Sequence, residues 1–203
     1  MIMNGLFLGI DSSTQGCKIV IINTTTWKID YSDSVTYDTD LPQYHTVDGV
    51  IPSGKSGVSE ASPLMWIDAL HLLFDRMKRQ KYPFADIRAI SVSGQQHGLV
   101  CLDKTGRLTR NSSKLWNDPS TTEECQLLTE GLGGRQAMIE EIGNTQRPGY
   151  TASKIYHLYR HEPEIAQKTD TFFLVHNYLN WFLTGGIRVM EPGDVSGMAL
   201  SFP

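Results

Sequence analysis

A carboxylate followed by small polar residues, between two apolar segments, is the first pattern in this sequence that could do chemistry. Residues 6–10 form a short apolar run that ends at Asp11, and residues 17–22 form a second run rich in β-branched side chains. The five residues between them are small or polar, which predicts a β-hairpin with a polar tip. Backbone N–H groups in such a turn can bind phosphate, and a carboxylate beside them can hold Mg²⁺. A plain hairpin whose polar side chains only satisfy turn hydrogen bonds is the alternative interpretation.

The candidate phosphate ligands of this turn are Ser13, Thr14 and Lys18. The two hydroxyls supply donors, and the ammonium group at the start of the second run supplies a positive charge. The segment from Asp11 to Lys18 matches neither GxxxxGK[ST] nor GxGxxG, so P-loop and dinucleotide-binding chemistry are not supported for this turn.

A second polar cluster follows an apolar segment at residues 87–92. Gln95, Gln96 and His97 come directly after Ser93-Gly94, where the segment ends. Ligand sites in α/β sheets form at strand ends, and amide and imidazole groups both donate and accept hydrogen bonds, which suits a sugar. The same side chains could instead only cap the strand. We interpret four other histidines as structural: His45, His71, His157 and His161.

A third cluster consists of Trp116, Asn117 and Asp118. An indole can cover the apolar C–H face of a sugar while a neighbouring amide and carboxylate bind its hydroxyls. Asp118 is also expected to cap a helix at 121–132, with Pro119 in its first turn. The two interpretations are compatible.

Strands and helices must position these clusters. A third strand is predicted within 28–37, a surface loop over 41–59, and a helix that begins at Pro63 with Ser62 as its N-cap. Apolar residues recur every four positions along that helix, at Met65, Ala69, Leu73 and Met77. A strand is predicted at 99–102, helices at 121–132, 152–160 and 177–183, and a strand-like segment at 198–200.

Composition narrows the class of protein. With 203 residues, 40% apolar content and a net charge of -4, the chain can bury a core but lacks a cationic field for nucleic acid or anionic lipid. Its three cysteines are widely spaced and form no CxxC pair, which argues against a disulfide framework or a zinc site. No apolar run approaches the roughly 20 residues of a membrane span, and no signal segment is apparent, so we expect a cytoplasmic protein with neither nucleic-acid nor membrane partners.

Together these segments resemble a known family. LGIDSSTQGCKIVI, SVSGQQHGLVCLD, LWNDPSTTEEC, PGYTASKIYHLYRHEPE, HNYLNWFLTGG and EPGDVSGMAL, in this order and spacing, are similar to the N-terminal domain of FGGY carbohydrate kinases over nearly the whole chain. SGQQHG is most similar to the xylulokinase branch of that family. The resemblance implies an α/β, RNase H-like (actin-like ATPase) domain, with a mixed sheet flanked by helices.

The resemblance also implies roles for the three clusters. Two domains of this fold would close on ATP, Mg²⁺ and a small-molecule sugar. Asp11 matches the aspartate that organises Mg²⁺ and the transferred phosphate, and Ser13, Thr14 and Lys18 lie in its phosphate turn. Gln96 and His97 match the pair that touches the sugar, where the glycerol-specific branch has an Arg-Glu pair. Residues 116–118 match the border of the sugar pocket, and Asp194 matches a family aspartate near the end of the domain.

Two departures from the family pattern stand out. The usual aspartate-leucine-glycine-threonine turn is Asp11-Ser12-Ser13-Thr14 here, so a glycine is replaced. The general base of the family is an aspartate that follows the Asp194 region by a few dozen residues, and this sequence ends at Pro203. We therefore expect residues 1–203 to be an N-terminal domain without its base or its C-terminal nucleotide-side domain, and to be inactive alone.

Several alternatives stay open at this point. The complete kinase could act on D-xylulose, on ribulose or on gluconate, or the fold could serve as a non-catalytic sugar-sensing module. The oligomeric state is also open, with a homodimer among the alternatives.

Overall fold

The computed structural model describes residues 5–198, which fall into two compact units. The first unit comprises the residues up to Ile51 together with Leu64–Gln95. The second comprises Pro52–Pro63 and the residues from Gln96 onward. Within the described part of the chain, each helix is too short or too polar to cross a lipid bilayer.

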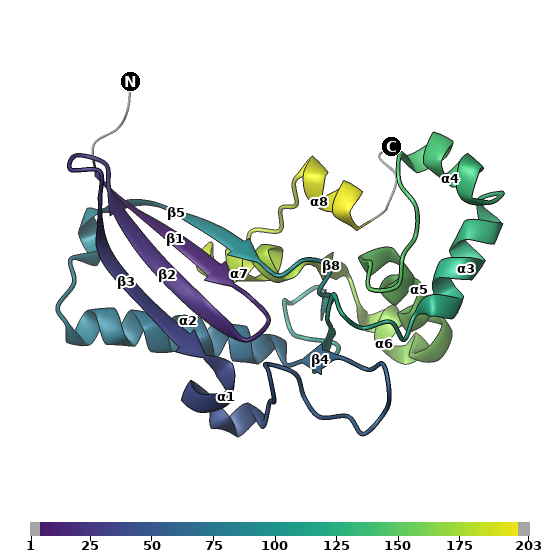
Figure 1. The fold of residues 1–203 in the computed structure, drawn as a ribbon, viewed down its shortest axis with the longest axis horizontal. Coiled ribbons are helices and arrows are strands. Elements are labelled where there is room, and N and C mark those ends of the chain that lie inside the picture. Colours follow the sequence, from purple (N-terminus) through teal and green to yellow (C-terminus); the bar gives the residue numbers. More distant parts are fainter. Residues whose placement is uncertain (1–4, 199–203) are drawn as a thin grey trace. The chain divides into compact units, whose positions relative to one another are not determined.

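A four-stranded mixed sheet forms the centre of the first unit (Figure 1). Its strands lie in the order β3 (Lys28–Thr36), β2 (Gly16–Asn23), β1 (Leu6–Ser12) and β5 (Ile87–Gly94). β1 pairs antiparallel with β2 and parallel with β5, and β2 pairs antiparallel with β3. These strands confirm the predicted hairpin, the third strand and the strand at 87–92. The mixed sheet also confirms the predicted α/β class.

Helix α2 (Pro63–Arg79) lies in the chain between the antiparallel strands and β5, and it packs along the sheet (Figure 1). A parallel pair such as β1 and β5 needs a crossover of this kind, because a tight turn cannot reverse the chain twice. The predicted apolar stripe is confirmed, since its four residues are fully buried: Met65, Ala69, Leu73 and Met77. Truncating one of them, for example Leu73→Ala, is expected to cost about 2–5 kcal/mol.

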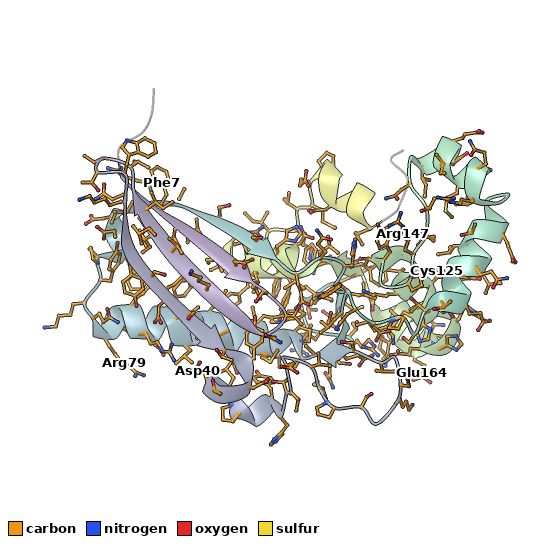
Figure 2. The ribbon with its side chains drawn as sticks, in the orientation of Figure 1. Phe7, Asp40, Arg79, Cys125, Arg147 and Glu164 are labelled. Carbon is orange, nitrogen blue, oxygen red and sulfur yellow. The ribbon has the colours of Figure 1, made fainter. Side chains whose placement is uncertain are left out.

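Alternate residues of β1 and β2 provide the matching apolar face of the sheet. Leu8 and Ile10 on β1 and Ile19 and Ile21 on β2 are buried, while the residues between them are exposed or half-buried. Arg76 on α2 also donates hydrogen bonds to Ser34 O (2.9 Å) and to Asp40 (2.6 Å) beyond the end of β3. Figure 2 labels Asp40 and, at the C-terminal end of α2, Arg79.

The segment predicted as a surface loop is ordered by one carboxylate. After the short helices α1 (Tyr37–Asp40) and η1 (Pro42–Tyr44), the chain folds back on Asp38. Asp38 accepts hydrogen bonds from Thr46 Oγ1 (2.7 Å), Asp48 N (2.7 Å) and Gly49 N (3.1 Å). A further 3-10 turn, η2 (Phe84–Asp86), leads into β5.

Two small antiparallel strand pairs organise the second unit. β4 (Glu60–Ala61) pairs with β7 (Ser113–Lys114), and β6 (Val100–Leu102) pairs with β8 (Thr171–Phe173). β6 confirms the strand predicted at 99–102. Cys101 in β6 and Leu99 just before it are buried with Leu158 and Ala166 in a core that draws on two helices.

Six helices complete the second unit: α3 (Thr122–Gly131), α4 (Arg135–Ile142), α5 (Thr151–His161), α6 (Pro163–Lys168), α7 (Val175–Leu183) and α8 (Pro192–Gly197). α3, α5 and α7 confirm the three predicted helices, and the other three were not predicted. The segment expected to be strand-like at 198–200 extends beyond the described residues. Figure 2 marks Cys125 on α3.

One predicted helix cap is wrong. The N-cap of α3 is Thr121, and no side chain there bonds the helix N-terminus. Asp118 lies three residues earlier and instead accepts a hydrogen bond from Ser120 N (2.9 Å). An aspartate often bonds the backbone two residues onward, and here that local turn uses the oxygen that a cap would have used.

Candidate active site

The turn between β1 and β2 is held by bonds inside the turn. Ser13 N donates to Gly16 O (2.9 Å), and Ser13 Oγ donates to the same oxygen (3.0 Å). The Ser12 side chain is fully buried, with its Oγ 2.9 Å from the hydroxyl of Tyr37. Burial raises the pKa of Tyr37, so this hydroxyl stays neutral. The hydroxyl of Ser13, which the sequence predicted as a phosphate ligand, and its N–H are therefore both engaged within the turn.

Asp11 lies on the exposed face of the sheet, because side chains alternate along β1 and Ser12 points inward. In the strand register Asp11 stands opposite Lys18 on β2 and opposite Ser93 on β5. An open pocket of about 320 Å³ includes Asp11, Ser13 and Lys18 in its lining. Three of the four residues predicted for metal and phosphate therefore share one pocket of the first unit.

Thr14, the fourth of these residues, contacts Gln95, which the sequence placed in the second polar cluster but not among the predicted sugar ligands. Its Oγ1 lies 3.5 Å from Gln95 Oε1, and Gln95 Nε2 lies 3.5 Å from Ser13 O. Gln95 is buried, and its backbone N–H donates to Ser12 O (2.8 Å). Gln95 therefore supports the turn between β1 and β2, whereas the predicted sugar contacts were its neighbours Gln96 and His97.

Gly49 is a second residue at this turn without a predicted role. Its φ is +77°, and a Cβ there would lie 1.9 Å from Thr14 O. Only glycine permits that approach, so the 41–59 segment packs directly on the turn. The Asp48-Gly49 dipeptide is a common turn signal and could have indicated the bend, but not its contact.

The chemical groups of Asp11, Ser13 and Lys18 are of the types that bind Mg²⁺ and phosphate. Mg²⁺ takes hard oxygen ligands and keeps several waters, so it is bound by one or two carboxylates together with phosphate oxygens. The exposed carboxylate of Asp11 provides such a ligand. The ammonium group of Lys18 in the same pocket suits phosphate, whereas the hydroxyl of Ser13 would have to exchange its bond to Gly16 O for one to phosphate.

His97, in the second unit, has an unusual backbone. Its φ is +56°, a conformation that L-residues rarely adopt without tertiary support. Two contacts supply that support. The imidazole stacks on Tyr150, with ring centroids 4.3 Å apart and planes at 27°, and His97 O accepts a hydrogen bond from Lys154 Nζ (2.5 Å).

Lys154 joins two of the predicted sugar-binding segments. Its side chain is 1% exposed, and its Nζ also donates to Leu115 O (2.8 Å), next to Trp116. Burial lowers the pKa of Lys154 from its ordinary value of 10.5 to about 7, although the nearby charge of Asp118 opposes this shift. The burial of Lys154 could not be predicted from the sequence, because a lysine in an amphipathic helix is usually exposed.

Trp116 and Asn117 remain accessible at the edge of this cluster. The indole of Trp116 is 50% exposed, and Asn117 accepts a hydrogen bond from Ser59 Oγ (2.7 Å). Gly149, with a φ of +95°, packs so closely that a Cβ would lie 2.2 Å from Trp116 O. The 148–150 segment therefore contacts both Trp116 and His97.

Asp118 is completely buried. It accepts hydrogen bonds from Ser59 N (2.9 Å) and from the backbone and hydroxyl of Ser120, and it lies 3.5 Å from Lys114 Nζ. These contacts hold the loop that carries Trp116. Gln96, by contrast, is exposed. Asp11 belongs to the first unit and His97 to the second.

Asp194 is a buried carboxylate at the start of α8. It accepts hydrogen bonds from Asn177 Nδ2 (2.7 Å) and Glu191 N (3.1 Å), and its Oδ1 lies 2.7 Å from His176 Nε2. Burial favours the neutral acid, but these bonds outweigh that effect and lower the pKa of Asp194. All the contacts of this aspartate are typical of a structural anchor between α7 and α8.

Comparison with known proteins identifies the family. Residues 6–201 match the model for the FGGY family of carbohydrate kinases, N-terminal domain. The xylulose kinase of Saccharomyces cerevisiae is 32% identical over 222 residues, covering 98% of this chain and 36% of the yeast protein. Other curated relatives are also xylulose kinases, for example those of Arabidopsis thaliana and Mus musculus.

Solved structures agree with this assignment. The xylulose kinase of Bifidobacterium adolescentis superposes with a TM-score of 0.74 at 26% identity, covering 97% of this chain and 40% of that one. The gluconate kinase of Lactobacillus acidophilus gives 0.75 at 25% identity, covering 96% and 36%. This chain thus spans between 36% and 40% of the length of these three relatives.

The actin-like fold expected from the sequence is confirmed by these superpositions. The family model covers both compact units, including the turn at Asp11 and the cluster around His97. This chain belongs to the FGGY family of carbohydrate kinases and corresponds to the N-terminal domain of that family.

Proposed function

We propose that this chain is the sugar-side domain of a kinase that transfers the γ-phosphate of ATP to D-xylulose, giving D-xylulose 5-phosphate. The observation that carries the proposal is the cluster of the second unit, where Lys154 Nζ binds both His97 O and Leu115 O and so ties the segment that carries His97 to the segment that carries Trp116. The chain's curated relatives named above are xylulose kinases, which favours this sugar over others.

On the phosphate side, Asp11 would hold Mg²⁺ directly or through water, and Lys18, Ser13 and Thr14 would contact phosphate oxygens. Bound ATP and Mg²⁺ would supply the phosphoryl group and neutralise its charge. Phosphoryl transfer needs little covalent help from the protein, so the contribution of these residues is positioning and electrostatic stabilisation. We place the general base and the nucleotide-side domain outside residues 1–203.

On the sugar side, Gln96 and His97 would hydrogen-bond the hydroxyls, and Asn117 would add an amide. The half-exposed indole of Trp116 would cover a C–H face of the sugar. Asp118 would act indirectly, because its carboxylate is buried against Ser59 and Ser120 and fixes the loop.

A gluconate kinase is the second candidate, since the gluconate kinase of Lactobacillus acidophilus is as similar in structure as the xylulose kinase above. The two sugars differ in charge, because gluconate carries a carboxylate and D-xylulose does not. A non-catalytic sugar-sensing module is the third candidate, and it predicts sugar binding without ATP turnover.

Sugar binding by the 203-residue chain tests the proposal. D-xylulose, D-ribulose, gluconate and glycerol are titrated in turn while NMR follows the indole N–H of Trp116, with exposed Trp27 in the first unit as an internal reference. D-xylulose is expected to shift the Trp116 signal alone, and His97→Ala is expected to weaken binding by at least about tenfold, or about 1.4 kcal/mol. His71→Ala, at an exposed site on α2, is the matched control.

If gluconate or D-ribulose bound more tightly than D-xylulose, that compound would replace D-xylulose as the proposed substrate. If none of the four compounds moved the Trp116 signal at saturating concentration, the proposed sugar contacts of the second unit would be wrong.

A further inference from the structure

Three side chains of the second unit that the kinase proposal does not use come together between two helices. Glu124 lies on α3, and His157 and His161 lie on α5. The Nε2 atom of His161 is 3.0 Å from Glu124 Oε1, and the Nδ1 atom of His157 is 3.4 Å from Glu124 Oε2. Figure 2 labels Cys125, the residue after Glu124, which marks where α3 carries this cluster.

The spacing of the two histidines is suited to a shared ligand. Residues four apart lie on the same face of a helix, and the imidazoles of His157 and His161 have centroids 4.4 Å apart. Candidate ligand atoms of all three residues lie within 4.8 Å of one another. Tetrahedral Zn²⁺ with bonds of about 2.0–2.1 Å places neighbouring ligand atoms about 3.3 Å apart, so small side-chain rotations would close the set.

The Nδ1 atom of His157 is the second observation that points to a ligand. It is buried and makes no hydrogen bond of normal geometry among the described residues. It faces Glu124 Oε2 at 3.4 Å, which is an ion-pair distance and leaves room for an ion to be drawn in between them.

Arg160 is the main competing contact. Its guanidinium donates to Glu124 Oε1 (2.6 Å), which explains the buried carboxylate as part of an ordinary ion-pair cluster. Oε2, however, faces His157 at ion-pair distance only. Carboxylates that bind metals are commonly held by an outer hydrogen-bond donor, and Arg160 on Oε1 would orient the carboxylate in that way.

We propose that Glu124, His157 and His161 form a three-ligand site for one Zn²⁺ ion or a similar divalent transition metal, linking α3 to α5. His161 has a side-chain exposure of 45%, so the fourth coordination position faces solvent. Mg²⁺ is excluded as the occupant, since it prefers six oxygen ligands over imidazole nitrogens. The site is separate from Asp11 and does not depend on the kinase proposal.

Cobalt titration of the metal-free 203-residue chain tests the site, because Co²⁺ replaces Zn²⁺ and reports its geometry by visible absorption. We expect one Co²⁺ per chain with an intense four-coordinate spectrum, displacement by Zn²⁺, and no effect of Mg²⁺. A sulfur-to-cobalt charge-transfer band must be absent, because it would place the ion on Cys125 or another thiol instead.

Variants decide between a metal site and an ion-pair cluster. His157→Gln and His161→Gln are each expected to weaken Co²⁺ and Zn²⁺ binding by at least about 100-fold, since loss of an outer-shell partner alone costs 10–100-fold. His71→Gln is the control and is expected to bind as the unmodified chain does. Thermal unfolding without metal shows whether each variant folds, and the zinc-induced rise in its midpoint gives a second measure of binding.

Two results would overturn the proposal. One is the lack of a four-coordinate Co²⁺ spectrum with the unmodified chain. The other is equal metal affinity in the two histidine variants and the control, which would leave only the ion-pair cluster with Arg160.

Discussion

Replacing Lys154 by methionine should destabilise the second unit in a manner that depends on pH. The native ammonium or amine donates to two backbone carbonyls, His97 O at 2.5 Å and Leu115 O at 2.8 Å. Leaving each of these oxygens without that donor costs about 1–3 kcal/mol, whereas methionine avoids the cost of burying a polar amine, which is neutral in the folded chain at pH 9 because its pKa is about 7. We expect Lys154→Met to lower the free energy of unfolding by about 2–4 kcal/mol at pH 9.

The pH dependence follows from the lowered pKa. Lys154 has a pKa of about 7 in the folded chain against 10.5 as its ordinary value. Between these values the unfolded chain binds a proton that the folded chain does not, so stability rises with pH by up to about 1.4 kcal/mol per pH unit. The difference between the native chain and Lys154→Met should therefore shrink by up to about 2.7 kcal/mol when the pH falls from 9 to 7.

Urea unfolding at pH 7, 8 and 9, followed by circular dichroism, measures these differences. Hydrogen exchange localises them, because the amides of Leu99 and Leu115 donate to Lys114 O (3.2 Å) and Ser59 O (2.9 Å) within the same cluster. Lys168→Met, at an exposed lysine on α6, is the control. A stability loss below about 0.5 kcal/mol, as expected for the control, or one that does not vary with pH, would refute the role assigned to Lys154.

Three further predictions concern the clusters around the site. Gly149→Ala should destabilise the chain more than Gly134→Ala, since both have positive φ but only the first would place a Cβ 2.2 Å from Trp116 O; urea unfolding and Trp116 fluorescence measure this. Gln95→Ala should increase hydrogen exchange in the turn at 13–16 while leaving α5 unchanged, and unchanged exchange in the turn would contradict the support given by Gln95. Glu60→Gln should lower the free energy of unfolding by about 1–3 kcal/mol at pH 7. Burial alone would raise the pKa of Glu60, but the bonds from Arg110 and Ser112 outweigh burial and lower it from its ordinary value of 4.5. The difference between the native chain and the variant should therefore shrink below pH 4.5 and vanish as the pH falls through the lowered pKa.

The part of the fold that follows from local pattern was predictable. The hairpin of β1 and β2 and the buried stripe of α2 appear directly in the order of apolar and polar residues. The short helices α4, α6 and α8 were missed, because six to eight residues carry too few turns for a periodicity to emerge.

The sequence predicts which residue types form the candidate site better than it predicts the contacts between them. Asp11 and His97 could be selected because each follows an apolar run, which is local information. The direction of Gln95 after β5, the burial of Lys154 and the use of Asp118 in a local turn depend on packing between distant segments. Glu124 and His161 are separated by 37 positions in the chain, and their meeting could not be read from spacing.

The most direct test of the central claim is ATP turnover by the whole protein that contains this chain, measured with D-xylulose as ADP release. Asp11→Asn is expected to lower kcat by at least about 100-fold with little change in sugar KM, because Asp11 serves the metal and the phosphate. His97→Ala is expected to raise the KM for D-xylulose by at least about tenfold, because His97 serves the sugar. A whole protein that turns over no sugar, or one whose turnover is unchanged by both substitutions, would contradict the assignment.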